Sequence, residues 1–305
     1  MNKIDLTVEI AGVEFRNPIM TASGTFGYGE EFNEYIDLSK LGGIVTKSVT
    51  LNPRPGHKPP RTCETAGGML NAIGLANVGI DRFITEKIPF LQTLDTNVVV
   101  NVAGFSIEEY VTVIDKLNNC DGIAMLEINI SCPNVGADGL EFSSTPESAH
   151  RLTSELKKTS RFPLVIKLSP NVTDVASIAK ACEDAGADAL SMINTLVGMG
   201  VNHYTFEPLL TNITGGLSGP AIKPVALACV HKVYSSVEIP IIGIGGIMDH
   251  LDVAQFIIAG ATAAQFGTAN FINPNATVDA VDGLKNYLRD MDIQCIKELT
   301  GKLKV

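Results

Sequence analysis

Polar or small residues that could do chemistry stand at the ends of eight short apolar runs in this chain. The most reactive is Cys132, which lies within residues 128–134, INISCPN, between an apolar run and a proline. A thiolate is a nucleophile and a base, and a free thiol with a pKa of about 8.5 can be tuned by a nearby cation. The others are Ser23, Lys47, Ser48, Asn101, Asn129, Lys167, Asn194, Thr195, Gly245, Gly246, Gly267 and Thr268.

Cys132 differs from the other cysteines in its position. A free cysteine is ordinarily a buried, inert thiol, and we expect this of Cys63, Cys120, Cys182, Cys229 and Cys295. Cys132 precedes Pro133, which stops a strand and places the thiol at the strand end. Acyl transfer would require a histidine within reach, and only His57 and His203, in long loops, keep that alternative open. General base catalysis needs the thiol alone.

The last two runs favour a phosphate ligand. GIGGI (243–247) and FGTANF (266–271) each place small residues before a helical stretch, where free amides and the helix dipole bind anions. The ligand is a sugar phosphate or the phosphate tail of a flavin mononucleotide. Lys47 and Lys167 favour the flavin, because a fixed ammonium stabilises its reduced, anionic ring. Asn101 and Asn129 offer donors and acceptors for the amide edges of a flavin or pyrimidine.

The eight apolar runs predict a closed (β/α)8 TIM barrel. They cover residues 18–24, 43–50, 97–104, 125–133, 163–170, 189–195, 240–247 and 263–270. Helical periodicity fills most of the intervals, as in 106–119, 145–160, 171–187 and 248–261. Strand and helix alternating eight times implies parallel pairing, with an open, doubly wound sheet as the alternative. Barrel enzymes build their sites at the carboxyl ends of the strands, where the polar residues stand.

Further segments complete the predicted architecture. Residues 6–15 alternate apolar and polar residues around Ala11-Gly12 and predict a hairpin that plugs the N-terminal end of the barrel. Three long loops, 51–77, 134–145 and 196–221, follow strands and are expected to cover the C-terminal face. No low-complexity linker divides the chain, which predicts one domain over residues 1–305.

Composition limits the ligands and the compartment. The net charge is −10 and the 23 basic residues form no cluster, which argues against nucleic acid and membrane surfaces and favours small molecules. No segment resembles a signal peptide or approaches the ~20 apolar residues of a membrane span, so we expect a cytoplasmic protein. The six cysteines are scattered without a C-x-x-C pair, which predicts no metal site and no iron-sulfur cluster on this chain.

Several motifs, in order, carry a resemblance to a known family. They are TKSVT, NAIGLAN, NISCPN, IKLSP, INT, GGLSGPAIKP, IPIIGIGGI and QFGTA. Together, from about Val8 to Ala269, the chain resembles the dihydroorotate dehydrogenases of the soluble, cysteine-using class (class 1). Dihydropyrimidine dehydrogenases share a similar cysteine motif but typically carry histidine where this chain has Asn134. The membrane-bound class uses a serine base and an N-terminal extension, and this sequence has neither.

The resemblance implies oxidation of (S)-dihydroorotate to orotate on bound FMN in de novo pyrimidine (UMP) biosynthesis. Cys132 would take the proton from C5 while the C6 hydride passes to flavin N5. The implied substrate-binding residues are Lys47, Asn71, Ala72, Ile73, Gly74, Leu75, Asn129, Asn194 and Thr195. The implied FMN-binding residues are Ser23, Lys47, Ser48, Asn101, Asn129, Lys167, Ile193, Gly219, Gly245, Gly246, Gly267 and Thr268.

The resemblance also bears on the electron acceptor. One soluble subtype is a homodimer that reduces fumarate; the other, class 1B, pairs with a subunit carrying FAD and a [2Fe-2S] cluster and reduces NAD⁺. Residues 24–47 and 212–224 resemble the NAD-linked type, which implies a heterotetramer of two catalytic and two electron-transfer chains. Residues 198–210 contain no residue to which a family role can be carried over. Two other hypotheses stay open: a lyase or isomerase acting on a sugar phosphate, and a non-catalytic ligand-binding subunit.

Overall fold

Eight parallel strands close into a barrel, as the sequence predicts. The structure is a computed structural model and describes residues 4–131 and 142–304. The strands are β3 (Ile19–Thr21), β4 (Gly43–Val45), β7 (Asn97–Val102), β8 (Met125–Asn129), β9 (Leu164–Lys167), β10 (Ala189–Met192), β15 (Ile241–Ile244) and β16 (Ala263–Phe266). Their order around the barrel is β10-β15-β16-β3-β4-β7-β8-β9. Each predicted run contains one of these strands, and the closure excludes the doubly wound sheet.

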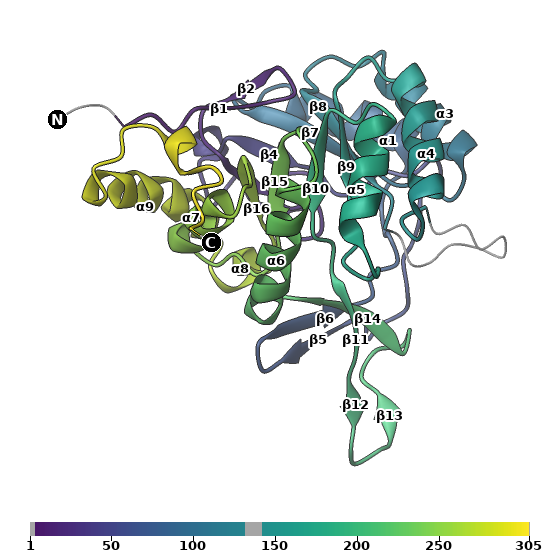
Figure 1. Cartoon of the computed structure of the whole chain (residues 1–305). Coiled ribbons are helices and arrows are strands. Elements are labelled where there is room, and N and C mark those ends of the chain that lie inside the picture. Colours follow the sequence, from purple (N-terminus) through teal and green to yellow (C-terminus); the bar gives the residue numbers. More distant parts are fainter. Residues whose placement is uncertain (1–3, 132–141, 305) are drawn as a thin grey trace.

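Helices cover the outside of the barrel (Figure 1). The longer ones are α3 (Ile107–Leu117), α4 (Pro146–Thr159), α5 (Val175–Asp184), α6 (Lys223–Tyr234), α7 (His250–Ile258) and α9 (Ala276–Asp290). Three begin at the predicted kind of cap, because Ser106, Thr145 and Asp249 accept hydrogen bonds from amides of the first turn. Their apolar faces pack on barrel strands that are buried except at Asn97, the half-buried first residue of β7.

Shorter helical segments complete the chain. They are α1 (Ile80–Arg82), the π-helix η2 (Phe83–Lys87), α2 (Ile88–Leu91), α8 (Ala269–Ile272) and the 3-10 turns η1 (Leu38–Lys40), η3 (Pro220–Ile222) and η4 (Ile296–Leu299). The interval between β3 and β4 departs from the predicted alternation, since it holds turns and η1 in place of an α-helix. Gly27 and Gly29 have φ angles of 55° and 90° there, a left-handed backbone that interrupts a helix.

The predicted N-terminal hairpin is present and lies at the N-terminal end of the barrel. Strands β1 (Val8–Ile10) and β2 (Val13–Phe15) pair antiparallel. Phe15 is fully buried, and Asn97, the first residue of β7, donates from Nδ2 to the carbonyl of Glu14 at 2.8 Å. The hairpin therefore closes the end of the barrel opposite the predicted site.

Two of the three long loops join into one small sheet. Strands β5 (Thr62–Thr65) and β6 (Gly68–Asn71) come from the first, and β11 (Leu196–Met199) and β14 (Thr214–Ser218) from the third. They pair in the order β11-β14-β6-β5. A hairpin of β12 (Val201–Asn202) and β13 (Glu207–Pro208) extends from this sheet away from the barrel (Figure 1). Most of the loop 134–145 lies outside the described residues.

Candidate active site

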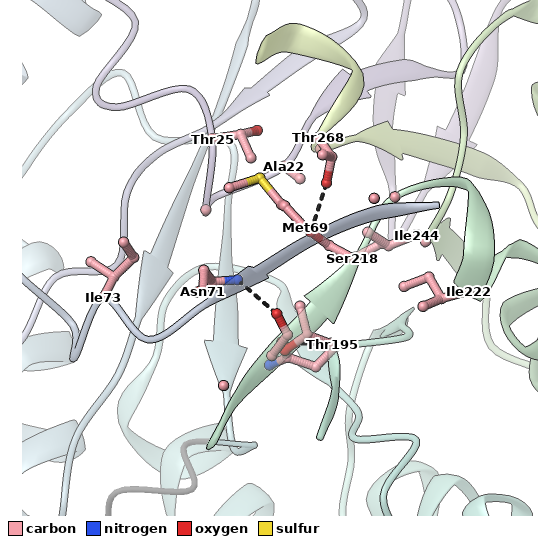
Figure 2. A pocket seen from close by; sticks show the side chains of 18 of the residues that line it. Ala22, Thr25, Met69, Asn71, Ile73, Thr195, Ser218, Ile222, Ile244 and Thr268 are labelled. Atoms are coloured by element: carbon pink, nitrogen blue, oxygen red, sulfur yellow. Dashed lines mark hydrogen bonds between the residues drawn. The ribbon is translucent and has the colours of Figure 1, made fainter. Parts of the chain in front are cut away.

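A large cavity opens at the C-terminal ends of the barrel strands. Its volume is about 990 Å³, at the upper end of what small-molecule sites occupy. Strand ends form its floor and walls, and residues of β5, β6 and β14 line it from the other side. Figure 2 shows Met69 and Asn71 on one strand that crosses the cavity, with Ile222 and Ile244 to one side of that strand. The two loops predicted to cover this face therefore contribute to the cavity wall.

The structure brings together nearly all the residues that the sequence singled out. Those that line the cavity are Ser23, Lys47, Ser48, Asn71, Ala72, Ile73, Gly74, Leu75, Asn129, Lys167, Ile193, Asn194, Thr195, Gly219, Gly245, Gly246, Gly267 and Thr268. Asn101 does not line it and is fully buried behind the wall. Cys132 lies outside the described residues, and Ser131, which precedes it, lines the cavity.

Asparagines on one side of the cavity hold one another in fixed orientations. Asn129, at the end of β8, accepts at Oδ1 from Asn194 Nδ2 at 3.1 Å. Asn194 in turn accepts at Oδ1 from the amide of Thr195 at 2.8 Å. The hydroxyl of Tyr110 donates to the Asn129 carbonyl at 2.7 Å. The side chains are thus positioned before a ligand arrives, which suits recognition of a ring with amide edges.

Polar contacts tie the covering strands to the barrel. Thr268 Oγ1, after β16, donates to Ser218 Oγ of β14 at 2.8 Å (Figure 2). Within the covering sheet, Asn71 Nδ2 of β6 donates to the Gly216 carbonyl of β14 at 3.3 Å. Asn171 donates to the Thr195 carbonyl at 2.9 Å and accepts from the Val197 amide at 2.9 Å. Sequence reasoning missed Ser218 and Asn171. Ser218 stands directly before Gly219 in a quoted motif, which was the available signal.

Two glycines of the predicted phosphate site have different surroundings. Gly246 has a φ of 76°, and a Cβ there would lie 2.7 Å from the backbone nitrogen of Lys223. At Gly267 a Cβ would meet nothing nearer than the Cβ of Ala22 at 3.8 Å. Gly246 is therefore required by the fold, whereas the absence of a side chain at Gly267 keeps space in the cavity.

The charged lining is mainly positive, although the chain is acidic. Among the described lining residues, the charged side chains are Lys47, Lys167 and Glu64. Burial lowers the pKa of Lys47, and the charge of Arg61 lowers it further, against an opposing effect of Glu31. An ammonium held in such a place gains from an anionic partner. The cavity is therefore suited to an anion.

A buried carboxylate behind the cavity wall was missed by sequence reasoning. Glu127 in β8 is fully buried and accepts from Asn101 Nδ2 at 2.6 Å, Gln265 Nε2 at 2.8 Å and Lys167 Nζ at 3.2 Å. Burial alone would raise the pKa of Glu127, but Lys167 and the amide donors outweigh it, so the pKa is lowered. An acidic residue inside a buried strand, two positions before Asn129 and on the same face, was the available signal.

The other cysteines have surroundings that suit inert thiols. Cys182 is fully buried, and burial raises its pKa to about 12. Burial also raises the pKa of Cys120 and Cys229. Cys63 lies in β5 and does not line the cavity. A thiol with a raised pKa carries little thiolate near neutral pH, so Cys120, Cys182 and Cys229 are poor candidates for the base. Cys63 is a poor candidate because it does not line the cavity.

The described residues form neither a metal site nor a membrane-spanning helix. In residues 4–131 and 142–304, no group of three or more histidine, cysteine, aspartate or glutamate side chains could hold a metal ion. Within the same part of the chain, every helix is too short or too polar to cross a membrane.

Comparison with known proteins finds similarity over nearly the whole chain. A family model described as dihydroorotate dehydrogenase matches residues 5–288. Proteins from Geotalea daltonii and Geobacter sulfurreducens are 55% and 52% identical over 305 residues, all of this chain and all of theirs. A protein from Alkaliphilus metalliredigens is 50% identical over 303 residues, 99% of this chain and 100% of its own length. All three are named dihydroorotate dehydrogenase B (NAD(+)), catalytic subunit.

Proposed function

This chain belongs to the dihydroorotate dehydrogenase family, and from that premise we propose that it oxidises (S)-dihydroorotate to orotate in de novo pyrimidine biosynthesis. The observation that carries the proposal is the polar cavity wall, where Lys47 and the asparagine group of Asn129 and Asn194 face one space. Dihydroorotate combines a carboxylate with a ring that has amide edges. An ammonium and oriented carboxamides are the groups that recognise these features.

The residues present fit an FMN cofactor. When bound, FMN supplies the acceptor for the hydride that leaves C6 of the substrate. Gly219, Gly245, Gly246, Gly267 and Thr268 would hold its phosphate; Ser23, Lys47, Ser48, Asn129, Lys167 and Ile193 would contact the rest of the molecule. The space left open at Gly267 and the ammonium of Lys167 support this assignment. We expect Asn101 to act through Glu127, to which it donates, since it does not reach the cavity.

The chain's own residues bind the substrate and move one proton. Lys47 pairs with the substrate carboxylate, and Asn71, Asn129, Asn194 and Thr195 hold the ring, aided by the backbone of residues 72–75. Cys132 is the general base that takes the proton from C5, an assignment that rests on its motif and on family membership. Closure of the covering strands over the ring excludes water from the reacting atoms.

NAD⁺ is proposed as the final acceptor, reached through a partner subunit. The relatives' names contain NAD(+) and the words catalytic subunit, which imply a partner. We propose that this partner carries FAD and a [2Fe-2S] cluster and that two copies of each chain form a heterotetramer. A cytoplasmic location is proposed as well, in keeping with the free thiols found in the described part of the chain.

Purification with its native partners tests the proposed function. We expect a yellow complex whose flavin absorbance bleaches when dihydroorotate is added and which reduces NAD⁺. The isolated chain should bleach with dihydroorotate, reduce dyes slowly, and reduce NAD⁺ at less than about one hundredth of the rate of the complex. A colourless chain that FMN cannot reconstitute would contradict the flavin assignment. NAD⁺ reduction by the chain alone would contradict the partner assignment only.

Replacement of Gly267 by valine is expected to weaken FMN binding at least tenfold without unfolding the protein. The new side chain enters open space, so the fold should accept it, but it occupies volume that the cofactor requires. Gly246→Val is the matched contrast, because it strains a positive φ and clashes with the backbone of Lys223. FMN titration and thermal unfolding separate the two variants. Gly267→Val with the FMN affinity of the parent chain would place the cofactor elsewhere.

A further inference from the structure

The carboxylate of Glu127 is surrounded by donors. Oε1 accepts from Asn101 and Lys167, and Oε2 accepts from Gln265. Among the described residues, the amide oxygens of Asn101 and Gln265 have no hydrogen-bond partner, so both amides turn their donor side to Glu127 and leave their acceptor side unsatisfied. An arrangement with three donors and two orphaned acceptors fits an anionic carboxylate and opposes a protonated one.

The same network crosses the inside of the barrel. Three strands lie between β8 and β16 in either direction around the ring, so Gln265 reaches Glu127 from the opposite wall. Lys167 on β9 likewise reaches the opposite wall, where its Nζ donates to Ser23 Oγ at 3.3 Å. Glu127 lies behind the cavity wall, whereas Lys167 and Ser23 line the cavity. The ammonium of Lys167 is therefore held between a buried anion and the ligand space.

We propose that Glu127 is a positioning residue for the flavin site: it is the buried counter-ion that fixes the Lys167 side chain and keeps it protonated beside the cofactor. This inference rests on the proposed function. A lysine with only 7% of its side chain exposed loses most of its hydration, and without an anion it would release its proton at a much lower pH. Glu127 thereby sets how strongly the site favours the reduced, anionic flavin.

The groups around the Glu127–Lys167 pair limit what else could change the flavin potential. In the described part of the chain, Lys167 Nζ contacts Glu127 on β8 and Ser23 after β3. The carboxylate of Glu127 in turn contacts Asn101 on β7, Gln265 on β16 and Ser191 on β10. Apart from Lys167, Glu127 is the one titratable side chain among these described groups. Lys47 is the other cation among the described lining residues, and it is present in the parent chain and in each variant below.

Glu127→Gln in the full chain loaded with FMN tests the proposal by the midpoint potential of the flavin as a function of pH. Below the lysine titration, Lys167 stays charged without its counter-ion, so the potential should lie above that of the parent chain. Above it, Lys167 is neutral and the potential should fall to that of the variant that combines Glu127→Gln with Lys167→Met, since neither of them then carries a charge at these two positions. The potential of Glu127→Gln should therefore show a break between the two pH ranges. Across this break we expect the preference for reduced over oxidised flavin to change at least tenfold, which is a change in midpoint potential of about 30 mV for a two-electron couple.

Two variants show which residue causes the break in the potential. Gln265→Met removes a neutral donor of the same network and should show no new break. Glu127→Gln combined with Lys167→Met removes the titrating group and should lose it. If Glu127→Gln binds FMN and its potential follows the parent chain at every pH, Glu127 has only a structural role and the inference is wrong. Failure of the parent chain to bind FMN would instead refute the proposed function.

A second measurement needs no cofactor and covers the case in which Glu127→Gln binds FMN poorly. Lys167→Met alone leaves Glu127 buried without its cation, so the unfolding temperature of the FMN-free full chain should fall. Adding Glu127→Gln to that variant should raise the unfolding temperature again, because the uncompensated charge is removed. A double variant no more stable than Lys167→Met would show that the two charges do not depend on each other.

Discussion

Exchange of Cys132 for serine is expected to lower the turnover of dihydroorotate near neutral pH roughly 10²- to 10⁴-fold, the usual contribution of a general base. A hydroxyl is a far weaker base than a thiol whose pKa lies near 8.5. FMN should stay bound, since the residues proposed to hold it are contributed by other strand ends, among them Lys167 and Thr268. Steady-state kinetics with a dye acceptor and the flavin absorbance of the purified variant measure the two effects separately.

The pH profile and a matched cysteine sharpen this test. Turnover of the parent chain should level off as the thiol titrates, whereas that of Cys132→Ser should continue to rise with pH. Cys63→Ser is the control, because Cys63 lies on the covering sheet without lining the cavity, and its turnover should stay within about twofold of the parent. Equal turnover in Cys132→Ser and the parent would mean that another group removes the proton.

The barrel could be predicted from sequence because its signals are local. Each of the eight apolar runs contains one strand, and the strand-end position of Lys47, Asn129 and Lys167 follows from the carboxyl-end rule for parallel strands. The segment between β3 and β4 was predicted less well, since the turns at Gly27 and Gly29 replace a helix. Composition and spacing were therefore sufficient to predict an element when the residues that form it are close together in the sequence.

Contacts between distant segments could not be predicted in the same way. The small sheet pairs β6 with β14, about 145 residues away, through contacts such as Asn71 with Gly216. Neither loop is strongly apolar, so periodicity gives no strand signal. Glu127 has the same difficulty: its partner Gln265 lies on the opposite wall, 138 residues away. The closed barrel creates these contacts, and a linear pattern does not contain them.

Replacement of Lys47 by methionine is expected to weaken orotate binding roughly ten- to hundredfold near neutral pH. A hydrogen bond to a charged group contributes about 1.5–3 kcal/mol, and each 1.4 kcal/mol corresponds to about tenfold in affinity. Titration of the flavin absorbance with orotate measures the dissociation constant. Lys47→Arg keeps the charge and should retain more of the affinity. A Lys47→Met variant that binds orotate as the parent does would remove Lys47 from the substrate site.

The lowered pKa of Lys47 gives that prediction a pH dependence of known sign. Only the ammonium attracts the substrate carboxylate, so orotate affinity should be present at neutral pH and be lost as pH rises through a value below 10.5. Lys47→Arg should keep its affinity over this range, because a guanidinium does not titrate there.

The buried ammonium of Lys47 is also expected to lower the stability of the ligand-free protein. The pKa of Lys47 is lower in the folded than in the unfolded chain. Between these two pKa values the unfolded chain binds more protons than the folded chain, so the stability of the fold rises with pH there. Near neutral pH the buried ammonium therefore destabilises the ligand-free protein. Lys47→Met should raise its unfolding temperature while it weakens orotate binding, and a variant that loses both affinity and stability would show that Lys47 supports the fold. The opposite signs of the two effects are what a charge retained for substrate binding predicts.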